Sequence, residues 1–429
     1  MSAPSRPSDP RAQPGAPATS PPTWWPAGLR EAGRKATPED RERLLSGEAW
    51  RAFAEAIGRA GEIVLGPGVP ETEIDRAEGY RHLAMLIRMG FSEAFVPRDR
   101  ERPAFGWADG TGKWGLDCAD ALYTQASIRG GAVYRVRGQR GSAHFMGFQL
   151  MAGMRPAADV DADSLALEPD GSFELVLGGE KREGNWIALP PDASGLQVRQ
   201  FFYDWDREVP ARLAIERIDE GERGEPDLEI TPGGVARQLE AVASFVHANA
   251  DYWAKVAIAK REEHANTFPA DHGIGVASSA AMRYQAFGIG CFVLEPDEAL
   301  IVEVRPPKAK YWSLHLGNFW YASLDFANYR TSINGHQAVL DRDGVFRAVV
   351  AHSDPGVPNW LDTAGHREGS MIYRWNQADG NPIPSARVVR LDEVRRELPP
   401  ETPRVDPAAR RAELERRRDH VRRRFSRPF

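Results

Sequence analysis

The segment LDRDGVFRAVVAHSDPGVPNWLDTA at residues 340–364 repeats the pattern of an earlier segment, LEPDGSFELVLGGEKREGNWIALP at residues 167–190. Each contains an Asp-Gly pair, a run of mostly apolar residues and an Asn-Trp pair, in the same order. Asp-Gly favours a tight turn, and apolar runs bounded by such turns favour strands. A repeat of this length decides the fold, because both copies are expected to form the same structural unit.

Four further pairs of segments extend the repeat. They are YRVRG at 134–138 with VEVRP at 302–306, HFMGFQL at 144–150 with KYWSLHL at 310–316, Arg199 and Asp204 with Arg374 and Asp379, and PARLAIERID at 210–219 with PSARVVRLD at 384–392. The offset is 166 residues from His144 to Lys310 and 175 residues from Arg199 to Arg374, and the order never changes. We therefore predict a tandem duplication with about six short strands in each copy, as in a β-sandwich or jelly roll.

The rest of the chain predicts an α+β protein with helices before and between the two β units. Thr37, Pro38 and Asp40 supply an N-cap, a proline at the first helical position and an acid three residues after the cap, so they predict a helix start. The apolar face of the connector is expected to pack across both β units. The predicted parts are a disordered tail at 1–23 with order beginning near Trp24 and Trp25, a helical cap at 24–118, a first β-sandwich unit at 119–232, a helical connector at 233–268, a second β-sandwich unit at 269–402, and a solvated, partly helical Arg-rich tail at 403–429.

The composition excludes several classes of function. A formal net charge of −6 over 429 residues argues against general nucleic-acid binding. Cys118 and Cys291 form no CxxC pattern, which argues against a disulfide framework or a cysteine-ligated metal. We find no signal-peptide core and no run of about 18 apolar residues, so we expect a cytoplasmic protein without a membrane partner. No dinucleotide fingerprint, P-loop or GxSxG elbow occurs, so no nucleotide cofactor is expected.

The run from Tyr284 to Pro399 resembles the bacterial family called domain of unknown function 1214. The motifs that carry the resemblance are Pro296-Asp297-Glu298-Ala299-Leu300, Tyr311-Trp312-Ser313, Asn318, Asp343-Gly344 and Asn359-Trp360-Leu361. The preceding half is similar to the segment that accompanies this domain in longer members of the family. The resemblance implies a fold rich in β-sandwich structure and implies little about chemistry.

Residues that recur in both copies are expected to be structural. Asn185 and Asn359 would each satisfy a turn, and Trp186 and Trp360 would each fill a core. The histidines differ, because His315 aligns with Gln149. The second copy has therefore gained imidazoles that the first lacks. The candidate catalytic residues are His315, His352, Asp354, His366 and Asp362.

One strand of the second copy carries the candidate ligand-binding face. Strand alternation places Tyr311, Ser313 and His315 on one side of 311–316, where they would line a ligand cavity or form an ordinary wet outer face. The following loop, Gly-Asn-Phe-Trp-Tyr at 317–321, suits stacking on a ring-shaped ligand or packing in a core. The candidate ligand-binding residues are Tyr311, Ser313, Asn318, Trp320, Tyr321, Trp360 and Arg374.

Three functions fit these residues. The first is an enzyme, of hydrolase or lyase type, in which a histidine performs acid/base chemistry on a small organic molecule, cyclic molecules included. The second is a binding or scaffold protein that recognises a sugar or a hydrophobic ring without catalysis. The third is a metal-dependent hydrolase using a divalent metal, although no HxH or HExxH spacing supports it. A homo-oligomer is compatible with all three.

Overall fold

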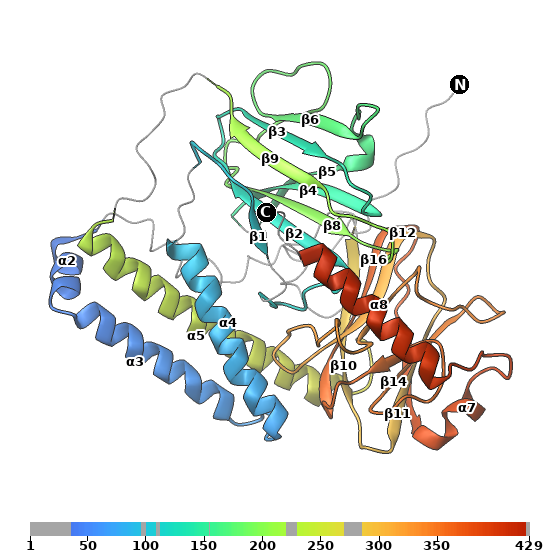
Figure 1. The fold of residues 1–429 in the computed structure, drawn as a ribbon. Helices are drawn as coiled ribbons and strands as arrows, with labels where there is room; N and C mark the ends of the chain where they lie inside the picture. Colours follow the sequence, from blue (N-terminus) through green and yellow to red (C-terminus); the bar gives the residue numbers. More distant parts are fainter. Residues whose placement is uncertain are drawn as a thin grey trace, which may run out of the picture.

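The computed structural model describes residues 36–95, 100–108, 112–153, 155–219, 230–269 and 285–425. The predictions for the tail at 1–23 and for Trp24 and Trp25 lie outside these residues. The fold is α+β, as predicted: a layer of helices lies beside two β units, and the helix α5 (Pro232–His264) connects the units (Figure 1).

The helical layer consists of α2 (Pro38–Leu45), α3 (Glu48–Glu62), the short 3-10 turn η1 (Ile63–Leu65), α4 (Glu73–Phe95) and α5. The predicted start of α2 is confirmed, because Thr37 caps the helix and exchanges hydrogen bonds with Asp40 in a capping box. α5 packs along α2, α3 and α4 and contacts β10 of the second unit, so its apolar face is covered mainly by the other helices. No helix in the described ranges has the length and apolar character needed to cross a bilayer.

The first β unit is a sandwich of two sheets around one core. One sheet has the order β1 (Gly106–Ala108), β2 (Ala121–Ser127), β8 (Gly195–Phe201), β4 (Phe145–Ala152), β5 (Arg155–Asp161), and the other has the order β7 (Trp186–Ile187), β6 (Ser172–Leu177), β3 (Tyr134–Gln139), β9 (Arg212–Arg217). The 3-10 turn η2 (Ala162–Ser164) follows β5.

The second β unit is a sandwich of two four-stranded sheets. The orders are β10 (Gln285–Val293), β16 (Glu368–Ala378), β12 (Ala309–Gly317), β13 (Ser332–Asn334), and β15 (Trp360–Asp362), β14 (Phe346–Ala351), β11 (Glu298–Val304), β17 (Ser385–Arg390). The chain ends with η3 (Leu391–Glu393), α7 (Val394–Glu397) and α8 (Pro407–Phe425).

The predicted duplication is confirmed strand by strand. The order β7-β6-β3-β9 in the first unit corresponds to β15-β14-β11-β17 in the second, and β2-β8-β4-β5 corresponds to β10-β16-β12-β13. In each unit the short strand after the Asn-Trp asparagine pairs in parallel with its neighbour: β7 pairs with β6, and β15 pairs with β14. Asn185 bonds the backbone N–H and C=O of Ala166 and the C=O of Glu174 at 2.8–2.9 Å. Asn359 makes the same three bonds to Val339 and Arg347 at 2.7–2.9 Å.

The prediction that both tryptophans after these asparagines fill a core holds only for Trp360, which is 6% exposed, because Trp186 is only half-buried. Trp360 packs into a separate apolar cluster with Val394 and Leu398, and not into the core between the two sheets. Its indole N–H donates to the carbonyl of Ala351 at 3.0 Å, because the parallel pairing of β14 and β15 brings that carbonyl within reach.

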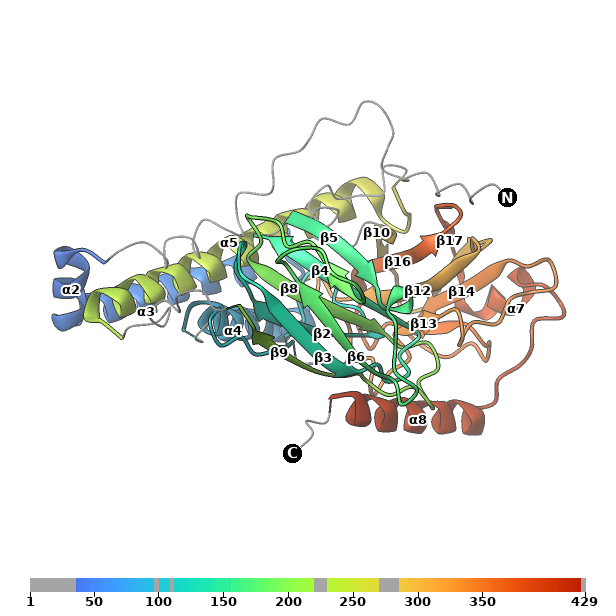
Figure 2. The same ribbon diagram turned by 90° about the horizontal axis from the view of Figure 1, so that it is seen from above.

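The Arg-rich tail is also not simply solvated. Arg410, Arg417 and Arg424 recur every seventh residue on α8 and are 5%, 4% and 1% exposed. Two helical turns separate successive members, so they share one face. Arg410 bonds Asp354 at 2.9 Å, Arg417 bonds the hydroxyl of Ser332 at 2.7 Å, and Figure 2 shows α8 lying along one side of the β units.

Replacing the two equivalent asparagines tests the duplication. Asn359→Ala removes three hydrogen bonds at a buried position, and at about 1 kcal/mol for each bond we expect it to lower the free energy of unfolding by about 3 kcal/mol. Asn185→Ala should lower the free energy of unfolding less, because Asn185 is only half-buried and water can replace part of the lost hydrogen bonding. Urea unfolding followed by circular dichroism measures both changes, and equal losses would contradict the burial argument.

Candidate functional site

The two β units meet through equivalent sheets, the one with β4 and β8 and the one with β12 and β16. The ring of Tyr311 on β12 lies 4.8 Å from the ring of Phe201 on β8. Lys310 Nζ lies 3.2 Å from an oxygen of Asp161, and Gln377 Nε2 donates to the same carboxylate at 2.6 Å. Figures 1 and 2 both show β8 beside β12 and β16 across this boundary.

We call the side chains between these two sheets the inter-unit layer. They are Tyr123, Gln149, Arg199 and Phe201 of the first unit, Tyr311, Ser313, His315, Arg374 and Asn376 of the second, and Cys118 and Asp120 of the segment before β2.

The pleat of the strands decides which side chains enter the inter-unit layer. On β4, Phe148 and Leu150 lie in the core of the first unit, so Gln149 between them points the other way. On β12, Trp312 and Leu314 lie in the core of the second unit, and the predicted grouping of alternate residues on the opposite face is confirmed. That face is not wet, since His315 is only 1% exposed.

Arg374 on β16 belongs to this layer and is 7% exposed. Its guanidinium donates to His315 Nε2 and to the carbonyl of Leu116. A guanidinium can only donate, so His315 accepts through Nε2. Burial lowers the pKa of His315 well below its usual value, the charge of Arg374 lowers it further, and the imidazole is neutral at pH 7. Across the described residues Arg374 has no carboxylate partner.

Arg199 occupies the equivalent position in the first unit. Its guanidinium lies 5.6 Å from the ring centre of Tyr123, and its Nε donates to Gln197 at 2.8 Å. Burial lowers the pKa of Arg199, Tyr123 and Asp159 oppose this shift, and the charge of Arg374 adds to it. The two equivalent arginines therefore lie near enough to repel, and an acid accompanies only the first.

Asp120 is the buried acid of the layer and is 0% exposed. One oxygen accepts from the indole of Trp205 at 2.8 Å and from the amide of Asn334 at 2.9 Å. The other accepts from the hydroxyl of Tyr311 at 2.7 Å. Burial raises the pKa of Asp120, and the hydrogen bonds from Tyr311 and Asn334 oppose that shift. Two N–H donors on one oxygen match an ionised carboxylate, so Asp120 ties the first unit to the second.

Two amide side chains of the layer have polar atoms without a partner. Gln149 is 0% exposed, and neither its oxygen nor its nitrogen has a hydrogen bond among the described residues. Asn376, which is 1% exposed, has no acceptor for its amide nitrogen in the same part of the chain. Buried polar groups are normally hydrogen-bonded, so each of these atoms needs an explanation.

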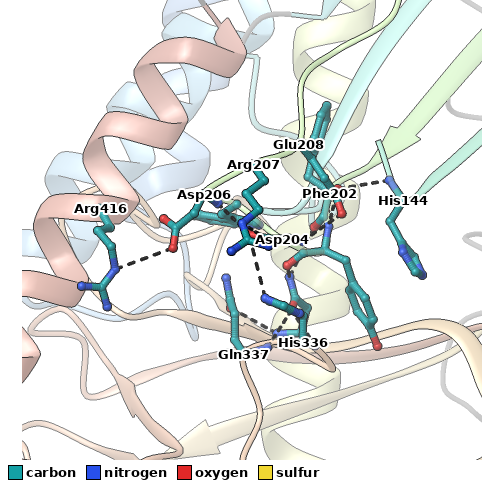
Figure 3. A network of polar contacts seen from close by, with 12 residues as sticks. His144, Phe202, Asp204, Asp206, Arg207, Glu208, His336, Gln337 and Arg416 are labelled. Carbon is teal, nitrogen blue, oxygen red and sulfur yellow. Dashed lines mark hydrogen bonds and ion pairs between the residues drawn. The ribbon is translucent and has the colours of Figure 1, made fainter. Parts of the chain in front are cut away.

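A polar network closes one edge of the inter-unit layer (Figure 3). The carboxylate of Glu208 accepts from the backbone N–H groups of His144, Tyr203 and Asp204 at 2.8–3.1 Å. Asp204 in turn lies 3.9 Å from the imidazole of His336, which follows β13. The network therefore holds the loop after β8 against the corner before β4 and against the second unit.

A second buried cluster joins α4 to the second β unit. His366 Nε2 lies 2.9 Å from Glu78 on α4, and His366 Nδ1 lies 2.9 Å from the carbonyl of Thr363. Both partners are acceptors, so the imidazole carries two protons and forms an ion pair with Glu78. Burial alone would raise the pKa of Glu78 and lower that of His366, but their hydrogen bond and opposite charges outweigh it in each case. The pKa of Glu78 is lowered and that of His366 is raised.

The remaining candidate catalytic residues lie elsewhere. His352 bonds the hydroxyl of Thr363 at 2.7 Å through Nδ1, so Thr363 links it to His366. Asp362 accepts from the backbone N–H of Ala364 at 2.8 Å, and Asp354 receives Arg410 of α8 at 2.9 Å. His352 and Asp354 follow β14, and Asp362 is the last residue of β15. Both strands belong to the sheet opposite to the one that contains His315, and among the described residues these three side chains make no contact with His315.

The aromatic loop after β12 packs against the helices. Trp320 is fully buried and donates to the carbonyl of Asp75 on α4 at 3.1 Å. Tyr321 stacks on Trp253 of α5 with ring centres 4.8 Å apart. Asn318 donates to Glu78, which places it in the second cluster. Of the candidate ligand-binding residues, Tyr311, Ser313 and Arg374 thus share the inter-unit layer, whereas Asn318, Trp320 and Tyr321 join the second unit to the helical layer.

Gln149, Asn376, Asp120 and Glu78 are the polar residues of these sites that the sequence did not single out. Gln149 had one usable signal, because it aligns with His315 and is the one polar residue in the otherwise apolar run 145–152. Within the described residues no three His, Cys, Asp or Glu side chains come together as metal ligands.

Comparisons with known proteins give a family and a fold. The family model described as protein of unknown function (DUF1214) matches residues 298–379. The crystal structure of an uncharacterised protein from Burkholderia cenocepacia is 35% identical, with a TM-score of 0.75, and the match covers 82% of this chain and 100% of that chain. The VPA0106 protein of Vibrio parahaemolyticus is 12% identical over 73% of this chain and 98% of its own, with a TM-score of 0.43. No curated protein matches.

Asp120→Asn tests the buried acid. The substitution removes the negative charge that faces Arg417 and Arg424 and replaces one acceptor oxygen by N–H₂, and we expect a loss of about 3 kcal/mol or more in the free energy of unfolding. Asp206→Asn, at a position with 58% side-chain exposure, is the matched control and should change stability by no more than about 0.5 kcal/mol. If Asp120→Asn and Asp206→Asn lowered the free energy of unfolding equally, Asp120 would not stabilise the contact between the units.

The Glu78–His366 pair predicts a pH window for stability. The raised pKa of His366 gives stability that is complete below its unfolded value of 6.5 and is lost as the pH rises through the folded value. The lowered pKa of Glu78 gives stability that is complete above 4.5 and is lost as the pH falls through the folded value. Glu78→Gln should therefore cost most between pH 4.5 and 6.5. A cost that rose steadily above pH 7 would contradict the ion pair.

Proposed function

Because this chain belongs to the DUF1214 family of proteins of unknown function, we propose a function from its site alone: it is a cytoplasmic protein that binds a small organic carboxylate in the inter-unit layer. The ligand would lie between the sheet containing β4 and β8 and the sheet containing β12 and β16. Arg374 would bind its carboxylate group.

The single observation that carries this proposal is the state of Arg374. A buried cation without a counter-charge is costly, and buried charges in proteins are normally paired. Arg374 is 7% exposed, and its partners are a neutral imidazole and a backbone carbonyl. A carboxylate is the natural complement, because a guanidinium can donate to both of its oxygens.

The surrounding charges favour a monoanion. Arg199 already has Asp159 nearby, and Asp120 is balanced by the charges of Arg417 and Arg424 on α8. Arg374 has no such acid among the described residues, so a single carboxylate would supply the charge that it lacks. Ser313 lies directly opposite Arg374 in the ladder between β12 and β16, so its hydroxyl would lie beside the same ligand group.

An enzyme that uses histidine acid/base chemistry is the second candidate function. The observation in its favour is the chain from His352 through Thr363 to His366 and Glu78, since an imidazole oriented by a carboxylate is the usual arrangement for proton transfer. Against it, His366 is 2% exposed and Glu78 already neutralises it. A metal-dependent hydrolase has no supporting observation among the described residues.

The variant Arg374→Gln tests the proposed function. We expect monocarboxylates such as propionate and lactate to raise the melting temperature of the wild-type chain and to bind measurably by calorimetry. Loss of one charged hydrogen-bonding partner costs about 2–3 kcal/mol, so Arg374→Gln should weaken binding roughly 30- to 150-fold.

Two further variants make the result interpretable. Arg374→Lys keeps the positive charge but cannot form bidentate hydrogen bonds, so it should retain part of the affinity for the carboxylate. Arg367→Gln removes an arginine with 60% side-chain exposure and should leave binding unchanged. Circular dichroism confirms that each variant is folded. Carboxylate binding that survives Arg374→Gln in a folded chain would refute the proposal.

A further inference from the structure

We infer that the ligand of the inter-unit layer is a hydroxy- or oxo-carboxylate, whose second oxygen is bound by the amides of Gln149 and Asn376. This inference rests on the proposed function and adds to it the class of ligand. It depends on atoms different from those that bind the carboxylate.

Gln149 gives the first argument. It lies on the face of β4 that points into the layer, it is 0% exposed, and both its amide oxygen and its amide nitrogen lack a partner. The equivalent residue of the second unit, His315, has its ring bound by Arg374. The two copies therefore differ at this position, and the first copy presents an amide that can both donate and accept.

Asn376 gives the second argument, from the other sheet. It is two residues after Arg374 on β16, so both side chains point to the same face of the strand. Its ladder partner is Tyr311, which also lies in the layer. The amide nitrogen of Asn376 has no acceptor in the described part of the chain. A ligand bound to Arg374 is thus flanked by an unused N–H donor.

These unused groups select between ligands that share a carboxylate. A plain alkanoate leaves the amides without partners, whereas a hydroxyl or keto oxygen can accept from either of them. Leaving a buried polar group unpaired lowers affinity by roughly 5- to 150-fold. Sites built to bind a ligand oxygen reject the analogue that lacks it for this reason. The layer should therefore distinguish lactate or pyruvate from propionate.

The experiment compares matched acids on the full-length chain. The pairs are propionate with lactate and with pyruvate, and 3-phenylpropionate with 3-phenyllactate, titrated by calorimetry. For the wild-type chain we expect the oxygenated member of each pair to bind roughly 5- to 150-fold more tightly. The double variant Gln149→Leu/Asn376→Leu should reduce this preference to within about twofold, while the affinity for the plain acids stays the same.

Gln139→Leu is the matched control, because Gln139 lies exposed on β3, away from the layer, and its substitution should keep the full preference. Equal affinity for both members of every pair, with binding still lost in Arg374→Gln, would refute this inference and leave the proposed function standing. A preference that persists in Gln149→Leu/Asn376→Leu would refute it too, because other groups would then recognise the oxygen. If no acid binds the wild-type chain, the proposed function and this inference both fail.

Discussion

The buried carboxylate of Asp120 is the interaction on which the arrangement of this protein depends. It accepts hydrogen bonds from Trp205 of the first β unit and from Tyr311 and Asn334 of the second, and two arginines of α8 balance its charge. Moving a carboxylate out of water costs several kcal/mol unless hydrogen bonds and charges compensate it. The partners of Asp120 therefore stay together, and this fixes both units and α8 relative to one another.

The duplication explains why the units meet as they do. Equivalent sheets face each other, as in an isologous dimer in which one surface patch contacts its own copy. The registers of β4 with β5 and of β12 with β13 make Asp161 and Asn334 equivalent. Their contacts across the boundary are reciprocal: Gln377 donates to Asp161, and Asn334 donates to the carbonyl of Phe202, the residue equivalent to Gln377. The interface thus has the pattern of a dimer contact within one chain.

Local signals in the sequence predicted most of the fold, and contacts between distant segments account for what it missed. Turn pairs and alternation found the long strands, and the repeat found the two units, because both depend on neighbouring residues. The sequence did not show that the face with Tyr311, Ser313 and His315 would be buried, since an outer face and an interface share the same alternation. Asp120 could not be recognised either, because its partners come from positions 205, 311 and 334.

Under the proposed function, divergence between the facing copies would give the inter-unit layer a single binding side. An exactly repeated interface would place two alike arginines opposite each other, with the same partners and the same charge. In the folded chain Arg199 has Asp159 nearby, whereas Arg374 has the neutral His315, which replaces the glutamine of the first copy. Uncompensated charge and unpaired amides reduce stability, and the contacts around Asp120 hold them in place despite that cost. A carboxylate with a second oxygen would remove both penalties at once, and that is the physical reason for which we propose the layer as a binding site.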